Sequence, residues 1–139
     1  FKSKAGHIWF ATESVLKYNN NAFSLYNSKQ GLINKNSKAF IADDSGNMYI
    51  GTDSGLTKFT FDNDNNITSC TNFTEHDGLS NNWVTSLAKG INNTIWIGTV
   101  DGGLNRYKTD KTGKSTFTNL TEKDGLISRN SYFNCPIIT

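Results

Sequence analysis

The sequence predicts an all-β protein built from consecutive repeats, and three observations lead to this prediction. First, residues 94–104 (TIWIGTVDGGL) are closely repeated at 47–56 (NMYIGTDSGL) and 7–16 (HIWFATESVL). Second, the central aromatic residues of these stretches lie 40 and 47 residues apart, a period typical of propeller blades or helical repeats. Third, the composition favours strands and tight turns, with 12 Gly, nine Phe, five Tyr, three Trp and one Pro.

The repeated stretch itself has the pattern of a short strand. Its five apolar or small residues are bounded by turn residues, which suits a strand buried on both faces, and the run is too short for a helix. Alternation along a strand places the aromatic residue and a Gly or Ala two positions later on one face. The pairs are Trp9 with Ala11, Tyr49 with Gly51, and Trp96 with Gly98. A large ring beside a small neighbour indicates that a second sheet packs closely on this face.

A hairpin follows the repeated strand in each unit. We align Leu16, Leu56 and Leu104 after its turn, with Val15 standing where the other two units have Gly. A cation and an aromatic residue come next, in an expected third strand, and they are Lys17-Tyr18, Lys58-Phe59 and Arg106-Tyr107. These positions predict a β-hairpin built on the repeated strand.

A fourth strand is expected after a polar hairpin tip, at the same position in each unit. Phe23, Cys70 and Phe117 are spaced by 47 residues, and we expect Phe23 and Phe117 in the core and Cys70 as a buried thiol that behaves as a small hydrophobic residue in an aromatic position. A disulfide between Cys70 and Cys135 stays open, because two cysteines do not indicate a compartment. A Gly-Leu pair then recurs at 31–32, 78–79 and 125–126, before an apolar strand that leads into the next repeat.

Four strands per unit make one propeller blade. We place the units at about residues 6–45, 46–92 and 93–135, so that residues 1–139 form a segment of three four-stranded blades. Three blades do not close a ring, and we therefore expect a part of a larger propeller, of about seven blades, or a self-associating unit. Its partners would be the rest of the same propeller or neighbouring copies, because terminal blades expose faces and strand edges.

Charge and hydropathy exclude two classes of partner. The net charge of +2 comes from 14 basic and 12 acidic residues without a long run, which argues against nucleic acid. No stretch approaches the roughly 20 apolar residues of a membrane helix, so we expect no membrane contact by this segment.

The repeats resemble the two-component regulator propeller repeat family. The resemblance lies in residues 6–12 (GHIWFAT), 46–52 (GNMYIGT) and 94–107, with Asp-Gly-Leu at 77–79 and 124–126, and it departs at Val15 and Thr94. Such repeats are similar to those in periplasmic sensor regions of Bacteroides-type hybrid two-component histidine kinases. The resemblance implies a non-catalytic ligand-sensing or scaffold segment, located in the periplasm, responding to an oligosaccharide, in a homodimeric parent protein.

No catalytic, cofactor or metal site is expected in this chain. Residues that recur in every unit are interpreted as scaffold, which includes Asp77 and Asp124 before their glycines. His7 and His76 have no metal-ligand spacing, and residues 62–73 fail the calcium-loop pattern at its sixth and twelfth positions. Two alternatives remain open: a fragment of a propeller lyase or glycan-active enzyme, for which His76 is the one candidate, and a structural interaction module of a secreted protein.

The candidate ligand site lies in the links between units. Trp83 stands where the other units have Asn36 and Asn130, and a Trp in a polar link is covered by protein or by ligand. Links of neighbouring blades open at one end near the propeller axis. The expected ligand-binding residues are Trp83, Asn82, Arg129, Asn130 and Tyr132. Packing at a blade junction is the alternative role of Trp83.

Overall fold

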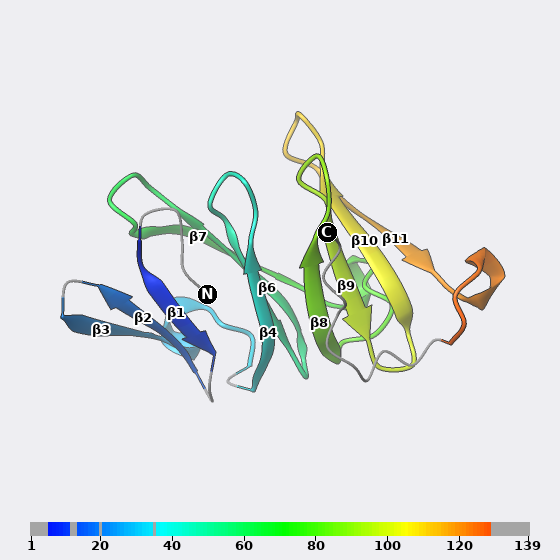
Figure 1. Cartoon of the computed structure of the whole chain (residues 1–139), viewed down its shortest axis with the longest axis horizontal. Helices are drawn as coiled ribbons and strands as arrows, with labels where there is room; N and C mark the ends of the chain where they lie inside the picture. The colour runs from blue at the N-terminus through cyan, green and yellow to red at the C-terminus, as the bar shows by residue number, and fades with distance from the viewer. Residues whose placement is uncertain (1–5, 12–13, 20, 35, 129–139) are drawn as a thin grey trace.

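The computed structural model describes residues 6–128 except 12–13, 20 and 35, and these residues form three antiparallel sheets (Figure 1). The first sheet contains β1 (Ile8–Ala11), β2 (Val15–Asn19) and β3 (Ala22–Tyr26). The second contains β4 (Ser37–Ala42), β5 (Met48–Thr52), β6 (Gly55–Phe61) and β7 (Ile67–Phe73). The third contains β8 (Val84–Lys89), β9 (Ile95–Thr99), β10 (Gly103–Thr109) and β11 (Ser115–Leu120).

Helical structure in the described residues is limited to three single turns of 3-10 helix. They are η1 (Ser28–Gln30), η2 (Glu75–Asp77) and η3 (Glu122–Asp124), and each follows the last strand of a sheet. The prediction of an all-β protein of about three blades is therefore confirmed. Within each sheet, every strand pairs with the next along the chain, as expected of strands joined by hairpins.

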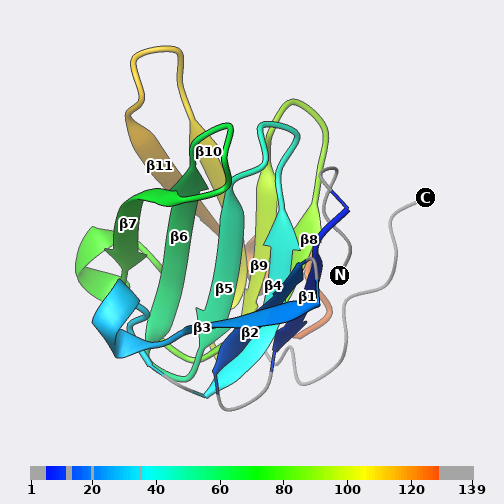
Figure 2. The same ribbon diagram turned by 90° about the vertical axis from the view of Figure 1, so that its left-hand side faces the viewer.

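The sheets stack face to face, and their first strands converge. β4 packs against β8, whereas the fourth strands β7 and β11 lie at the opposite edge of the stack (Figure 2). A repeat counted from the signature strand, such as residues 46–92, supplies β5 to β7 to one sheet and β8 to the next. Neighbouring sheets are thus joined by a link that runs from an outer strand to an inner one.

Two apolar clusters fill the spaces between the sheets. The first joins the first and second sheets and consists of Trp9, Val15, Leu32, Met48, Ile50 and Phe59. The second joins the second and third sheets and consists of Tyr49, Leu56, Phe73, Leu79, Val84, Ile95, Ile97 and Tyr107. The signature aromatic residues of the first two units project into these spaces, where the ring of Trp9 lies 5.7 Å from that of Phe61 and the ring of Tyr49 lies 5.5 Å from that of Tyr107. The hydrophobic core therefore consists of sheet-on-sheet packing.

The small residue beside the signature aromatic has the role that its pattern predicts. A Cβ added at Gly51 would overlap the side chain of Val84 in the next sheet. The absence of a side chain thus lets β5 approach β8 next to the Tyr49 ring. A cation from the neighbouring strand then covers the ring, with the Lys58 ammonium 5.5 Å from the Tyr49 ring centre and the Lys17 ammonium 5.7 Å from that of Trp9.

The first hairpin differs from its alignment by one residue. β1 and β2 pair Ala11 with Val15, whereas β5 and β6 pair Gly51 with Leu56. Val15, not Leu16, therefore occupies the position of Leu56, and it is fully buried. The alignment of Leu16 with Leu56 was wrong because the first turn is one residue shorter.

The expectation for the fourth strands was right for Phe117 and wrong for Phe23. Phe117 packs against the second cluster, with its ring 5.5 Å from that of Phe73. Phe23 is 65% exposed, because it lies on the outward face of the first sheet, where no other described sheet packs. Cys70 is half-buried, its Sγ lies 3.3 Å from the Gly31 carbonyl oxygen, and burial raises the pKa of its thiol. Cys135 lies outside the described residues.

The exposure of Phe23 predicts unequal costs of truncation. Phe59→Ala should lower the free energy of unfolding by about 3–5 kcal/mol, because Phe59 is 1% exposed between two sheets. Phe23→Ala should lower it by less than about 1 kcal/mol, as is usual for exposed positions. Urea unfolding at low protein concentration measures both values, and similar costs would contradict the packing described here.

The close approach of β5 and β8 predicts coupling between two positions. Gly51→Ala should destabilise the fold by about 1–3 kcal/mol, because the new methyl group overlaps Val84. Val84→Ala opens space at the same place, so the double variant should be clearly more stable than the sum of the single effects. Additive free energies in the four-variant cycle would show that the methyl group is accommodated elsewhere.

Candidate functional site

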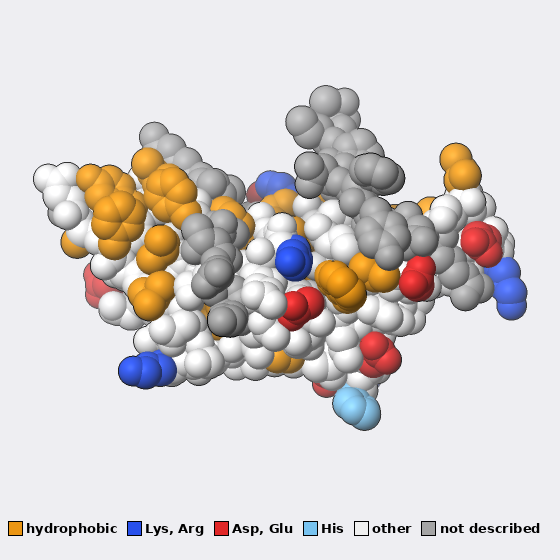
Figure 3. Space-filling model, turned by 90° about the horizontal axis from the view of Figure 1, so that it is seen from below, with side chains coloured by type: hydrophobic (Ala, Val, Ile, Leu, Met, Phe, Trp, Pro, Cys, Tyr) orange, Lys and Arg blue, Asp and Glu red, His pale blue; other side chains and the backbone are white. Residues whose placement is uncertain are grey.

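The links between sheets and the turns after the signature strands lie at one end of the molecule. Residues 31–36 connect the first sheet to β4, and residues 78–83 connect β7 to β8. This is the lower end in Figure 1, and Figure 3 views the molecule from that side. The hairpin tips 43–47, 62–66, 90–94 and 110–114 lie at the opposite end (Figure 1). The expected location of the links at one end is therefore observed for these two links.

Each link starts from a capped 3-10 turn. Asp77 accepts a hydrogen bond from the Thr74 backbone N–H at 2.8 Å, and Asp124 accepts one from Thr121 at 2.9 Å. The glycine that ends the turn has a left-handed backbone, with φ of +105° at Gly78, which favours glycine over any other residue. The interpretation of Asp77 and Asp124 as turn residues is confirmed.

Polar side chains of the following sheet hold the backbone of each link. The Ile33 N–H donates to Thr57 Oγ1 at 3.1 Å, and Asn72 Nδ2 donates to the Gly31 carbonyl oxygen at 3.0 Å. In the next link the Ser80 N–H donates to Asn105 Oδ1 at 2.9 Å. We call these two sets the link clasps. They fix the link backbones on the sheets, while Leu32 and Leu79 of the same links are buried in the two apolar clusters.

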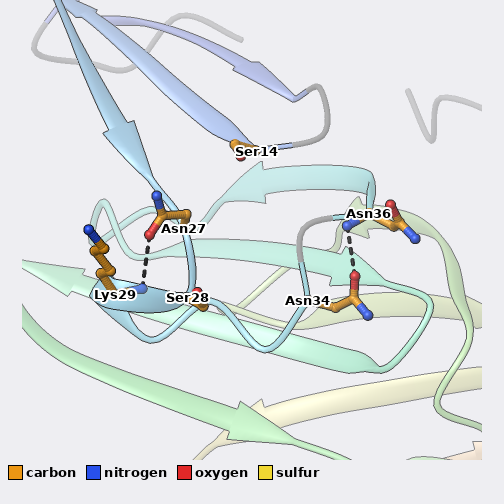
Figure 4. Close-up of a pocket in the computed structure, with 6 residues that line it drawn as sticks. All are labelled: Ser14, Asn27, Ser28, Lys29, Asn34 and Asn36. Carbon is orange, nitrogen blue, oxygen red and sulfur yellow. Dashed lines mark hydrogen bonds between the residues drawn. The ribbon is translucent and has the colours of Figure 1, made fainter.

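A polar cleft lies beside the first link (Figure 4). Its volume is about 550 Å³, and it is lined by Ser14, Asn27, Ser28, Lys29, Asn34 and Asn36. Asn36 Nδ2 donates to Asp53 Oδ2 at 2.7 Å, and Asn34 Oδ1 accepts from the Asn36 N–H at 2.9 Å. The described lining residues offer amides, hydroxyls and one ammonium group, and none of these described residues carries a carboxylate. Such a set suits an uncharged ligand rich in hydroxyl groups.

Trp83 lies in the second link and is 48% exposed. Its backbone is fixed, because the carbonyl oxygen accepts from the Val100 N–H at 3.0 Å and the N–H donates to Asn81 Oδ1 at 2.8 Å. No described aromatic ring packs on the indole. A large apolar surface is thus held on a rigid backbone at the end that carries the links.

The structure places the other expected site residues differently. Asn82 follows the turn η2, and its side chain binds the start of that turn: Oδ1 accepts from the Glu75 N–H at 2.8 Å. In return the Asn82 N–H donates to Glu75 Oε1 at 3.0 Å. Arg129, Asn130 and Tyr132 lie outside the described residues, so their role stays a prediction.

Trp83 and the cleft belong to neighbouring links. Trp83 immediately precedes β8, Asn36 immediately precedes β4, and these two strands pack against each other. Sequence reasoning missed the cleft residues Asn27 and Lys29. A signal was present, because Asn27 and Gln30 stand where the other units have Thr and Asp.

A second, smaller pocket lies among the hairpin tips at the opposite end. It has a volume of about 180 Å³, and Asp43, Tyr49, Lys58 and Asp110 are among its lining residues. The Tyr49 hydroxyl donates to Asp43 Oδ2 at 3.2 Å, and burial is the main reason that the pKa of Tyr49 is raised. Asp43 also accepts from the backbone of its own tip at Ser45 and Asn47. Its carboxylate therefore holds the tip and the neutral Tyr49 hydroxyl in place.

The described part of the chain offers neither a metal site nor a membrane-spanning helix. No three His, Cys, Asp or Glu side chains there are grouped as metal ligands would be. The same residues contain no helix with the length and apolarity needed to cross a membrane.

Comparison with known proteins gives a family match over part of the chain. Residues 78–101 match the model of the family described as two component regulator propeller, so the resemblance of the repeats to this family is confirmed there. No curated protein sequence matches the chain.

Three solved structures have a similar fold. The extracellular domain of a hybrid two component system from B. thetaiotaomicron has a TM-score of 0.67 at 21% identity, over 94% of this chain and 17% of that chain. That of a one component system from the same organism has a TM-score of 0.61 at 14% identity, over 86% and 21%. Virginiamycin B lyase from Staphylococcus aureus has a TM-score of 0.62 at 13% identity, over 86% and 40%. The chain thus spans less than half of each of these structures, and the similarity concerns the fold.

The hydrogen bonds of Asn82 predict a structural effect that is separate from ligand binding. Asn82→Ala should lower the free energy of unfolding by about 0.5–1.5 kcal/mol, because the Glu75 N–H loses its acceptor. Asn82→Asp retains an acceptor and serves as the matched control for that bond. Thermal unfolding of both variants measures the difference, and an unchanged melting temperature for Asn82→Ala would mean that water replaces the side chain without cost.

Proposed function

We propose that this chain of two-component regulator propeller repeats is a non-catalytic ligand-sensing segment of a periplasmic sensor, and that its link-bearing end binds an oligosaccharide. The observation that carries the proposal is the half-exposed Trp83, held on a fixed backbone in the link next to the one that borders a polar cleft whose described lining residues carry no carboxylate. A flat apolar side chain and hydroxyl-matching polar groups thus belong to neighbouring links at the same end of the molecule.

The chemistry of a sugar matches these two features. The faces of a pyranose ring carry C–H groups that pack on an indole, and its edge carries hydroxyl groups that donate and accept hydrogen bonds. Trp83 would supply the packing surface, and Asn34, Asn36 and Ser28 would supply hydrogen bonds in the cleft. Arg129, Asn130 and Tyr132 belong to the same proposal as polar neighbours from the third link.

The cellular context is also part of the proposal. Two of the similar structures are extracellular domains of two component and one component systems, which supports a place in the periplasm and a role in signal detection. The remaining partners would be other blades of the same propeller and a second copy of the parent protein. The net charge of +2 without a charged run supports neither nucleic acid nor a membrane surface as a partner.

A propeller lyase is the second candidate, favoured by the fold shared with virginiamycin B lyase. A general acid or base must be positioned beside the reacting group. His76 is exposed on η2, and His7 is buried, with its pKa lowered first by burial and then by the charge of Lys17. Neither histidine lines the polar cleft beside the first link, and the sensing role is therefore the better supported one.

The proposal predicts that Trp83 contributes to affinity and little to stability. An array of plant and host oligosaccharides would first identify a bound probe, and titration calorimetry with that probe would then compare variants. Trp83→Ala should weaken binding by about 1–3 kcal/mol, roughly 5-fold to 150-fold, because a packed aromatic anchor is lost. The melting temperature should stay nearly unchanged, because Trp83 is half-exposed.

Two controls make this result specific. Ile91→Ala removes an 83% exposed apolar side chain from a hairpin tip at the opposite end and should leave affinity unchanged. Trp83→Phe keeps a smaller ring and should give an intermediate affinity. A fall of several degrees in the melting temperature of Trp83→Ala with normal affinity would assign Trp83 to blade packing, and the absence of any bound oligosaccharide would contradict the proposed ligand class.

A further inference from the structure

The first link and the turn after β5 bind each other through polar side chains. Asn36 Nδ2 donates to Asp53 Oδ2 at 2.7 Å. Asn34 Nδ2 donates to Ser54 Oγ at 2.8 Å, and the Ser54 hydroxyl donates in turn to Asp53 Oδ1 at 3.2 Å. Both oxygens of the Asp53 carboxylate thus accept hydrogen bonds from within the protein.

The second link repeats the backbone turn of the first but carries an indole ring in place of one amide. Asn34 and Asn81 are equivalent, since the side-chain oxygen of each accepts from a backbone N–H two residues later, at 2.9 Å in the first link and 2.8 Å in the second. These N–H groups belong to Asn36 and Trp83, so Trp83 stands where Asn36 reaches its carboxylate. The carboxylate of the turn after β9 therefore has no amide opposite it.

That turn carries Asp101. Three residues, 100–102, join β9 to β10, whereas two residues, 53–54, join β5 to β6. Asp101 is exposed, and within the described part of the chain its carboxylate accepts no hydrogen bond. The Asn81 Nδ2 group likewise has no acceptor among the described residues, because the hydroxyl that Ser54 supplies is absent from the longer turn. One acceptor and one donor are thus left open.

Backbone contacts hold this turn against the second link. The Val100 N–H donates to the Trp83 carbonyl oxygen at 3.0 Å. On the other side of Asp101, a Cβ added at Gly102 would overlap the side chain of Asn81. Asp101 is flanked by these two contacts and therefore lies next to the link. A carboxylate, an amide donor and a half-exposed tryptophan thus come together at the link-bearing end.

We propose that Asp101 and Asn81 bind neighbouring hydroxyl groups of the sugar ring that packs on Trp83. This inference rests on the proposed oligosaccharide ligand and adds residues that select it. An ionised carboxylate only accepts hydrogen bonds, and an amide nitrogen only donates them. A hydroxyl group does both, so two adjacent hydroxyls on the edge of one ring match the pair. A ring without the hydroxyl opposite Asp101 leaves the carboxylate unpaired and is therefore disfavoured.

Variants at the two positions test the contact by titration calorimetry with the neutral oligosaccharide that binds best on the array. Asp101→Gly should weaken its binding about 10-fold to 100-fold, as expected when a hydrogen bond to a charged group is lost. Asp101→Asn keeps one oxygen and should give an intermediate affinity. Asn81→Asp retains the oxygen that accepts from the Trp83 N–H and removes the donor, so binding should weaken about 3-fold to 10-fold.

The Asp101 variants should fold like the wild type. Asp101 has a φ of +54°, which both glycine and asparagine tolerate, and its side chain binds no described residue. Their melting temperatures should therefore be nearly unchanged. Asp64→Asn removes the same charge from an exposed hairpin tip at the opposite end and should change neither melting nor affinity. Lower melting temperatures of the Asp101 variants with normal affinity would assign Asp101 to the turn and overturn the inference.

Monodeoxy analogues of the same oligosaccharide identify the hydroxyl group that Asp101 binds. The wild-type chain should bind at least one analogue about 10-fold more weakly than the parent sugar. Asp101→Gly should bind that analogue and the parent with affinities within about 3-fold, because the contact is already lost. Equal losses of affinity in the wild type and in Asp101→Gly for every analogue would overturn the inference. If Trp83→Ala still weakens binding in that case, the proposed function stands without Asp101, whereas a chain that binds no oligosaccharide contradicts both.

Discussion

The packing of a signature aromatic residue against the next sheet is the constraint on which the rest of the structure depends. Tyr49 projects from the second sheet onto Tyr107 of the third, next to the space that Gly51 leaves for Val84. Without that space the second strand of one sheet could not come close to the first strand of the next. Beside this close approach, β4 packs along β8 as well.

The aromatic residue also organises polar groups around the core. The Lys58 ammonium lies 5.9 Å from the ring centre of Tyr107 as well as near Tyr49, so one cation covers rings from two sheets. The Tyr49 hydroxyl in turn binds Asp43, which shapes its hairpin tip. Apolar packing, a cation and a carboxylate are thus grouped around Tyr49, and the contact between ring and cation recurs at Trp9 with Lys17.

The repeats made most of the fold predictable from sequence, and their irregularities limited the prediction. Strand positions follow from alternation and spacing, which are local properties. The burial of Phe23 could not be read from its spacing to Phe117, because burial depends on which sheet lies opposite. The shift from Leu16 to Val15 arises from one missing residue in a turn. Such a change moves every following side chain relative to its partner strand.

The candidate site could be predicted in part from irregularities of the repeat. Trp83 was proposed as a site residue because it departs from the residue type that the other units have at its position. The use of the Asn82 side chain to bind Glu75 is a contact across a turn, and the repeat pattern carries no information about it. The cleft beside the first link combines Ser14 from a hairpin turn with Asn27 and Asn36, which only the folded chain brings together.

The supply of β8 by the preceding repeat has a consequence for how the chain can be divided. A cut between residues 45 and 46 follows the repeat in the sequence, yet it separates β4 from the three strands that complete its sheet. A cut within a link, before Ser37 or before Val84, keeps each sheet whole. The sequence repeat and the four-stranded sheet are therefore offset by one strand. Insertion, deletion or exchange of blades preserves the hydrogen bonding of the sheets only when the cuts follow the sheet boundaries.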